Sequence, residues 1–374
     1  MTPFVMLALL IPLAAALVMV MLNLIFAPRL EAAVAEDSAA APRVSLLVPV
    51  RNEEENLTRN LPLLLQSDYE PLEIILLDDE STDSGRAVAE RLMASSNKDA
   101  RWVKGKPWTP ELRVSGKSNA CQQLAELASG EVLIFCDADV AISRHAVSRT
   151  VKWLQHSRSA GLTALPQQRF VGWRERLALP WIMQLPIAMT VPFFWSWRSG
   201  VRSLQLANGQ WLALRAQQYH AVGGHRSLGS TPLEDVALAQ KFHGRGVRGI
   251  RPVLALEDVR VQMYTDWPSL VAGFAKNLVA IFGGSPIGFV CAVALINMLF
   301  FLPLLSWLWS PALALFSLLL IALIRFFTAL MFRMPLFDLL LHPLSLGLFD
   351  LVALRALQSS WSGKYVWKER VIAR

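Results

Sequence analysis

The sequence predicts an α/β domain with a mainly parallel sheet, set between an N-terminal membrane anchor and a C-terminal membrane region. After residue 43, short apolar runs alternate with helix-like stretches, which is typical of a parallel sheet covered on both faces. Residues 3–27 carry no charge. Hydrophobic residues fill 54% of the 374 positions and charged residues only 17%, a composition too apolar for an ordinary soluble protein.

The first element is the apolar stretch 3–27, which exceeds the roughly 20 residues needed to cross a bilayer. A cleaved signal peptide is the alternative, and the triplet AVA at 33–35 resembles a cleavage site. The stretch is too long for a signal peptide, however, and no basic segment precedes it. Arg29 follows the stretch, so the positive-inside rule places the next domain in the cytosol. We therefore expect residues 1–30 to anchor a multi-pass protein of the cell (inner or plasma) membrane.

Three apolar runs predict buried strands of one domain, which we expect over residues 43–282. Ligands of such sheets bind at the carboxyl ends of the strands, so polar residues that follow the strands are the candidates for chemistry. The expected strands are 44–50, 72–78 and 131–137, and the expected helices are 53–66, 85–95 and 117–128.

A further apolar stretch, 177–195, interrupts this domain. A second spanning helix is one reading, but Pro180, Pro186 and Pro192 disfavour a regular helix. Trp and Arg residues flank the stretch, and such side chains prefer the level of the lipid head groups. We expect an interfacial segment over about 173–198.

The region 283–374 is again apolar and offers candidate spans at 286–305, 311–332 and 335–357. Three crossings would leave the basic tail outside, against the positive-inside rule. The last candidate contains Asp338, His342 and Asp350. We therefore expect it to be re-entrant, interfacial or divided into two short pieces.

The net charge of +7 favours anionic partners such as a lipid surface or a nucleotide diphosphate. Nucleic acid is not an expected partner, because no basic run is interleaved with aromatic residues. The three cysteines form no metal-binding pair and suggest no disulfide framework, which is compatible with a reducing compartment. The sequence leaves the oligomeric state open.

The motif FCDADV places Asp137 and Asp139 directly after a predicted strand, so both carboxylates can point into one cleft. Mg²⁺ and Mn²⁺ commonly bind through one or two carboxylates together with substrate phosphates. An acidic turn that caps the next helix is the alternative.

Two other strand and helix ends add polar residues to the same edge. LLDDESTDSG offers Asp78 and Asp79, and a carboxylate there can accept hydrogen bonds from a base or a ribose. A turn and helix cap, with Ser81 and Asp83 as the capping residues, is the alternative. GKSNACQQL places Lys117 at a predicted helix N-terminus, where it favours a phosphate. This is not a P-loop, because position 111 is Glu111 where that motif requires glycine.

The motif STPLEDVALAQKF predicts a short helix with Thr231 as its cap and Glu234 completing a capping box. That assignment gives Glu234 a structural role. Asp235 has no such role, so it is the better candidate for a general base that takes a proton from an acceptor hydroxyl.

The order of these motifs resembles glycosyltransferase family 2, whose members are inverting enzymes with a GT-A fold. The matching stretches run from VSLLVPVRNEEENL through GKSNACQQLAELASGEVLIFCDADV and NGQWLALRAQQYHAVGGH to LEDVALAQKF, over about 44–243. The resemblance implies a nucleotide-sugar donor, with a UDP-sugar expected, and a divalent metal. It further implies roles for individual residues: Arg51, Glu53 and Asp79 at the nucleoside, Lys117 at the diphosphate, Asp137 at the nucleotide, Asp139 at the metal and Asp235 as the base.

One anchor before the domain and several spans after it look like the lipid-glycosylating branch of the family, which includes ceramide, carotenoid-acid and hopanoid-associated glycosyltransferases. The QxxRW motif of processive synthases is missing, and VQMYTDW stands near its expected place. The resemblance therefore implies a single transfer to a membrane lipid. A processive polysaccharide synthase and a non-enzymatic scaffold that keeps the fold are the alternatives.

Overall fold

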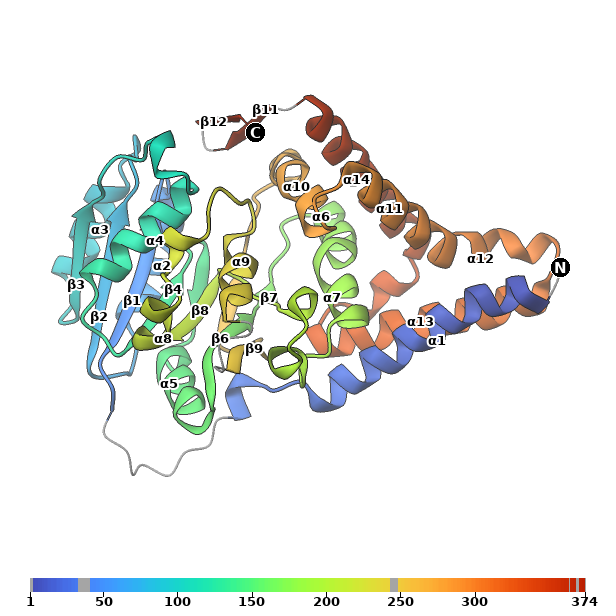
Figure 1. Ribbon diagram of the computed structural model, residues 1–374, viewed down its shortest axis with the longest axis horizontal. Helices are drawn as coiled ribbons and strands as arrows, with labels where there is room; N and C mark the ends of the chain where they lie inside the picture. The colour runs from blue at the N-terminus through green and yellow to red at the C-terminus, as the bar shows by residue number, and fades with distance from the viewer. Residues whose placement is uncertain (1–2, 33–40, 243–247, 363, 368–369, 374) are drawn as a thin grey trace. The chain divides into compact units, whose positions relative to one another are not determined.

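The computed structural model describes residues 3–32, 41–242, 248–362, 364–367 and 370–373. The chain divides into two compact units (Figure 1). The first, which we call the sheet unit, comprises Pro28–Arg169 and Phe193–Met263. The second, the helical unit, comprises Met1–Ala27, Phe170–Pro192 and Tyr264–Arg374.

A seven-stranded sheet organises the sheet unit, in the order β3-β2-β1-β4-β8-β6-β9. β8 pairs antiparallel with both β4 and β6, whereas the other neighbouring pairs are parallel. The prediction of a mainly parallel α/β sheet is confirmed. The strands are β1 (Val44–Val50), β2 (Leu72–Asp78), β3 (Asp99–Lys104), β4 (Val132–Cys136), β6 (Ser159–Leu165), β8 (Trp211–Arg215) and β9 (Arg248–Leu254).

Helices cover both faces of this sheet because alternate residues of its strands point to opposite sides. In β2, Ile74 and Leu76 join one core cluster with α2 and α5, whereas Ile75 and Leu77 join another with α4, α8 and α9. The three helices predicted between the strands are confirmed, and each boundary lies within one residue of the prediction. The helices of the unit are α2 (Glu54–Leu65), α3 (Gly85–Ala94), α4 (Gly116–Leu127), α5 (Ala146–His156), α8 (Ala216–Ala221) and α9 (Glu234–Lys241). Three short strands, β5 (Val140–Ile142), β10 (Val259–Val261) and β7 (Gln167–Gln168), form a second sheet.

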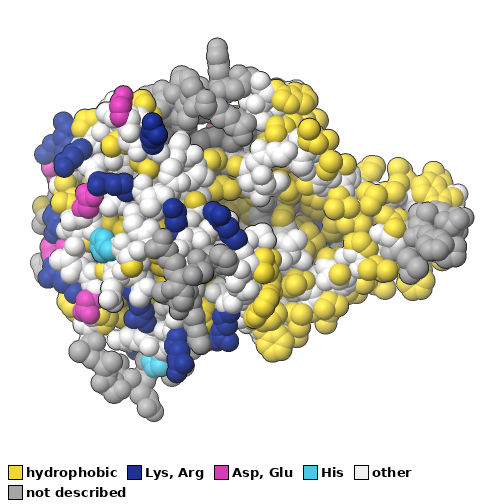
Figure 2. Space-filling view, viewed as in Figure 1, with side chains coloured by type: hydrophobic (Ala, Val, Ile, Leu, Met, Phe, Trp, Pro, Cys, Tyr) yellow, Lys and Arg dark blue, Asp and Glu magenta, His cyan; other side chains and the backbone are white. Residues whose placement is uncertain are grey.

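Among the described residues of the helical unit, three helical segments are long and apolar enough to cross a membrane: Ala8–Phe26, Pro286–Leu308 and Pro311–Phe332. They belong to α1 (Pro3–Phe26), to α11 (Pro286–Phe300) continued by α12 (Leu302–Leu305), and to α13 (Pro311–Phe332). In Figure 2, hydrophobic side chains dominate the surface of α1, α12 and α13, whereas Lys and Arg side chains gather over the sheet unit. The prediction of an N-terminal apolar helix and further C-terminal ones is confirmed.

Two apolar segments of the helical unit each consist of shorter helical pieces rather than one regular helix. Residues 173–190 form α6 (Trp173–Leu179), a π-helical turn that begins at Pro180 and α7 (Leu185–Thr190), and none of these pieces is a candidate span among the described residues. The candidate 335–357 divides into the 3₁₀ turn η8 (Leu336–Leu339) and α14 (His342–Ser362), which is not a candidate span either. The unit also contains α10 (Trp267–Ile281) and the hairpin of β11 (Lys364–Trp367) with β12 (Arg370–Ala373).

Candidate functional site

The candidate site lies at the carboxyl edge of the large sheet. β1, β2 and β4 run parallel, so the residues that follow them meet at one edge. β8 runs the opposite way, which brings the residues that precede it, 208–210, to the same edge. Asp137 N–H donates to the Gln210 carbonyl at 3.3 Å, which joins the two segments directly.

The loops after β1 and β2 hold each other through polar contacts. Arg51 Nη1 donates to the Asp79 carbonyl at 2.6 Å, and Asp79 is only 5% exposed. Asn52, which has a φ of 50°, accepts from Thr82 N–H at 2.8 Å. Glu53, the residue before α2, accepts from Asn56 at 2.6 Å. The structure therefore brings Arg51 and Asp79 together, as the proposed contact with one nucleoside requires.

The turn that carries Asp137 and Asp139 is anchored through its backbone. Val140 N–H donates to the Asp137 carbonyl at 3.1 Å, and Asn60 of α2 donates its side-chain amide to the Ala138 carbonyl at 2.9 Å. Because these hydrogen bonds hold the main chain of the turn on both sides, the backbone positions of Asp137 and Asp139 are defined.

Lys117 is a cation that lies between the carboxylates of the site. Ser115 caps α4 by accepting from Ser118 N–H, which places Lys117 in the first turn of that helix, as predicted. Its ammonium lies 2.8 Å from each carboxylate oxygen of Asp137 and 3.6 Å from Glu234. The lysine is thus held between two carboxylates from separate parts of the chain.

The prediction that Glu234 completes a capping box is wrong. α9 begins at Glu234 itself, and the preceding Leu233 has a φ of −121° and a ψ of 64°, so Thr231 and Pro232 lie outside the helix. Thr231 Oγ1 accepts from Leu233 N–H at 3.3 Å instead. Glu234 is therefore free to turn toward Lys117, and it belongs to the site.

Asp235 is oriented by two backbone amides. Gly209 N–H donates to its Oδ2 at 2.8 Å, and Val236 N–H donates to its Oδ1 at 2.8 Å. A β-carbon added at Gly209 would lie 3.4 Å from Lys117 Nζ and 3.7 Å from Asp235 Oδ2. Gly209 therefore lies against both the lysine and the carboxylate, a role that the sequence analysis did not assign to it.

Burial and charge together set the protonation of this group. Burial lowers the pKa of Lys117, but the charges of Asp137 and Glu234 outweigh it, so the pKa lies well above its ordinary value. Burial raises the pKa of both Glu234 and Asp235, and the nearby ammonium of Lys117 opposes that rise. A carboxyl with a raised pKa is a stronger base, which suits proton abstraction near neutral pH.

The oxygen donors at this edge fit a small divalent cation. Among the described residues, no three His, Cys, Asp or Glu side chains converge in a way that could hold a metal ion. A site of one or two carboxylates, completed by phosphates and water, is the arrangement that Mg²⁺ commonly adopts. Asp137 and Asp139 are the carboxylates at this edge that would supply that donor set.

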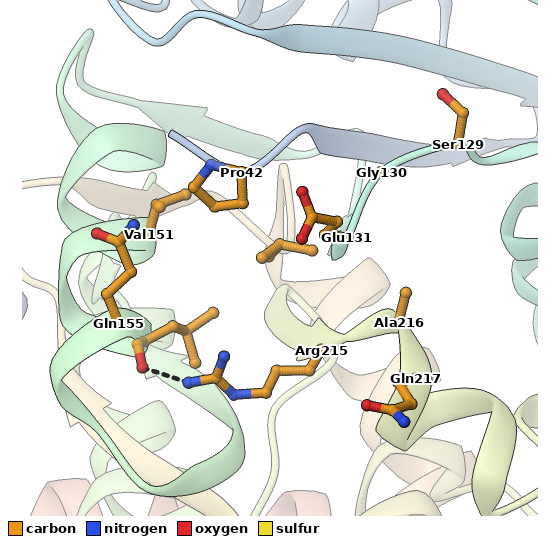
Figure 3. Close-up of a pocket in the computed structure, with 11 residues that line it drawn as sticks. Pro42, Ser129, Gly130, Glu131, Val151, Gln155, Arg215, Ala216 and Gln217 are labelled. Atoms are coloured by element: carbon orange, nitrogen blue, oxygen red, sulfur yellow. Dashed lines mark hydrogen bonds between the residues drawn. The ribbon is translucent and has the colours of Figure 1, made fainter. Parts of the chain in front are cut away.

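A separate cavity of about 410 Å³ lies at the opposite edge of the sheet, where β1 and β4 begin (Figure 3). Arg215 is the cationic side chain in its lining, and its guanidinium donates to the carbonyls of Leu154 and Ser157, at 2.6 and 3.1 Å. Because those bonds use Arg215 structurally and the acidic residues of the site lie at the other edge, this cavity is not the candidate site.

The chain is similar in sequence and in fold to known glycosyltransferases. Residues 45–195 match the family model described as glycosyl transferase family 2. Over this range the chain is similar to glycosyltransferase family 2. The 4,4'-diaponeurosporenoate glycosyltransferase of Staphylococcus aureus strain MRSA252 is 27% identical over 262 residues, an alignment that covers 67% of this chain and 65% of that relative. The predicted resemblance to family 2 and to its carotenoid-acid glycosyltransferases is confirmed.

The chain also has a solved structural neighbour. The mannosyltransferase PcManGT from Pyrobaculum calidifontis, solved in complex with GDP-Man and Mn²⁺, superposes with a TM-score of 0.53 at 18% identity, over 96% of this chain and 98% of that one. At this identity the likeness concerns the fold alone, and it confirms the predicted GT-A type.

Proposed function

We propose that the chain is an inverting glycosyltransferase that moves a hexosyl group from a nucleotide-diphosphate sugar to a membrane lipid. The observation that carries this proposal is Lys117, held between Asp137 and Glu234 at the N-terminus of α4. A lysine in the first turn of a helix is a ready site for a diphosphate, because the helix dipole and the ammonium act on the same anion.

The donor would extend from Lys117 toward the loops after β1 and β2. Arg51, Glu53 and Asp79 are the proposed nucleoside contacts, with Asp137 at the nucleotide. A UDP-sugar remains the expected donor, but PcManGT was solved with GDP-Man. Donor assays therefore need both nucleotides.

Mg²⁺ or Mn²⁺ would be held by Asp139, with Asp137 beside it. When bound, the metal would neutralise charge on the departing diphosphate, an effect worth several kcal/mol. Lys117 would add a second positive charge on that leaving group.

Asp235 is the proposed general base. It would take the proton from an acceptor hydroxyl as the hydroxyl oxygen bonds to the anomeric carbon, while the diphosphate leaves with the electrons of the broken bond. Gly209 N–H and Val236 N–H fix the direction of the carboxylate. If the acceptor is already a carboxylate, no base is needed.

The apolar helices support a membrane acceptor and a membrane location. The S. aureus relative is named for a carotenoid acid, diaponeurosporenoate, which is a lipid-like molecule. Two spans after the catalytic domain would return the chain to the side on which that domain lies, and we propose that this side is the cytosol. The basic tail would then follow the positive-inside rule.

The test replaces Asp139 and Asp235 by Asn separately and measures transfer from labelled UDP- and GDP-sugars to lipids in isolated membranes. We expect D235N to lower transfer to a hydroxyl acceptor by about 10²- to 10⁴-fold, and D139N to remove its dependence on Mg²⁺ or Mn²⁺. D99N is the matched control, because Asp99 is exposed on β3. Undiminished turnover in both variants would refute the assignment.

A further inference from the structure

A polar cluster lies inside the helical unit, where apolar packing is the rule. Arg325 lies within α13, one of the candidate spans, and is only 6% exposed. Ionisable side chains within spanning helices are energetically costly, and they commonly mark a binding or transport site.

Arg325 has incomplete partners. Its Nη2 donates to the Asp338 carbonyl at 3.0 Å, but the Asp338 carboxylate lies 3.0 Å from Arg176 Nη2 instead. Within the described part of the chain, no carboxylate lies in ion-pair distance of Arg325, and its Nη1 is buried without a hydrogen-bond partner. The guanidinium therefore keeps an unused donor.

His342, at the start of α14, leaves a second polar atom unused. Its Nε2 lies 2.8 Å from the Phe300 carbonyl, and because a carbonyl oxygen can only accept, Nε2 carries the hydrogen. Nδ1 is then an acceptor, and it is buried with no partner among the described residues.

Both groups lie against one indole. The Trp181 ring centroid lies 6.0 Å from Arg325 Cζ and 5.7 Å from the His342 ring centroid. Trp181 itself is fixed, because its Nε1 donates to Ser345 Oγ at 2.9 Å. A free donor and a free acceptor are thus brought near a rigid aromatic side chain.

The chain around these polar groups exposes apolar side chains. Phe337 is 62% exposed and Leu340 is 77% exposed, and they lie next to or between Asp338 and His342 in the sequence. Leu336 and Leu344, on either side of them, are also exposed. A polar interior beside an exposed apolar segment suits a molecule with a polar head and a hydrocarbon tail.

We propose that Arg325 and His342 bind the acidic head group, a carboxyl or phosphoryl oxyanion, of a membrane amphiphile whose tail lies along residues 336–344. The ionised head accepts from Arg325 Nη1, and a head that keeps a proton also donates to His342 Nδ1. This site goes beyond the proposed glycosyl transfer, since it requires binding only.

The test measures binding of cis-parinaric acid to the full-length protein in a neutral detergent, by energy transfer from tryptophan. Methyl parinarate is the matched ligand, because it has the same tail without the acid. We expect the acid to bind at least tenfold more tightly than the ester, R325Q to abolish this preference and R355Q to retain it. Arg355 is an exposed arginine of α14 and so makes a matched control.

A second variant and a competition experiment complete the test. If thermal unfolding shows that R325Q is not folded, H342Q replaces it and is expected to weaken acid binding at least threefold, since glutamine can still donate to Phe300. Oleate or phosphatidate should displace the probe, and which one does so identifies a carboxyl or phosphoryl head; acetate and inorganic phosphate should not. Equal binding of acid and ester, a preference retained in the folded variant, or displacement by the tail-less anions would overturn the proposal.

Discussion

Replacing Lys117 by Met tests whether its charge holds the site together. At the observed 2.8 Å to Asp137 and 3.6 Å to Glu234, an effective dielectric constant of 20 gives gross attractions of about 6 and 5 kcal/mol. Desolvation cancels most of this. The lysine side chain is 26% exposed, so this ion pair is intermediate between a surface pair and a buried pair. Surface ion pairs contribute less than about 1 kcal/mol, whereas breaking a buried pair costs about 3–5 kcal/mol. We expect K117M to lower the free energy of unfolding by about 2 kcal/mol.

The assay is denaturant unfolding in detergent of the wild type, K117M, D137N and the double variant. The coupling energy between the two positions should be about 2 kcal/mol, because removal of either partner leaves a half-buried charge. K104M is the control, since Lys104 is exposed at the end of β3, and its effect should stay within about 0.5 kcal/mol. UDP or GDP binding by K117M should weaken at least tenfold. Additivity of K117M and D137N within about 0.5 kcal/mol, with nucleotide binding unchanged, would refute the reasoning.

Two further predictions concern residues near Lys117. Gly209→Ala should change the free energy of unfolding by less than about 1 kcal/mol, because the new methyl group meets only ordinary van der Waals contacts. The same methyl group fills the space beside Lys117, so glycosyl transfer should fall at least tenfold. Gly347→Ala is the control, because a β-carbon there meets no atom within 4 Å, and it should leave transfer unchanged. His225 is only 3% exposed. Its burial, and to a smaller extent the charge of Lys117, lowers its pKa from 6.5 to about 3 in the folded state. Because the unfolded state binds a proton more readily, the free energy of unfolding should fall by up to about 1.4 kcal/mol per pH unit as the pH drops from 6.5 to 3. H225Q should flatten this slope in thermal unfolding between these pH values, and an unchanged slope would show that His225 does not cause it.

The sheet and most of the site could be predicted because they depend on local patterns. Each predicted strand is a continuous apolar run. A polar residue that faces solvent or ligand marks the end of the run, and so the end of the strand. Parallel pairing then brings Asp79 and Asp137 to one edge without any knowledge of side-chain contacts. Lys117 followed from a helix start that Ser115 caps.

Glu234 could not be predicted, because a local rule and a distant contact compete for the same side chain. The spacing from Thr231 satisfies the capping-box pattern, but that pattern assumes that the helix begins at Pro232. In the structure α9 begins two residues later. The attraction that matters for Glu234 comes from Lys117 on another helix, and nothing in the local spacing reports that distance. Gly209 was missed for a related reason, since its position follows from the reversed direction of β8.

The C-terminal region shows how polar residues in an apolar sequence can carry more information than the apolar ones. Asp338 and His342 argued against a regular span at 335–357, and the structure breaks the segment between them. The same residues lie beside Arg325 of the preceding helix, where the Asp338 carbonyl accepts one guanidinium N–H. A chain that needed only to cross the membrane would gain stability by replacing these groups with apolar ones, because each unpaired buried polar atom costs about 1–3 kcal/mol. Their presence, with one donor of Arg325 and one acceptor of His342 unused, is therefore better explained by a ligand than by packing.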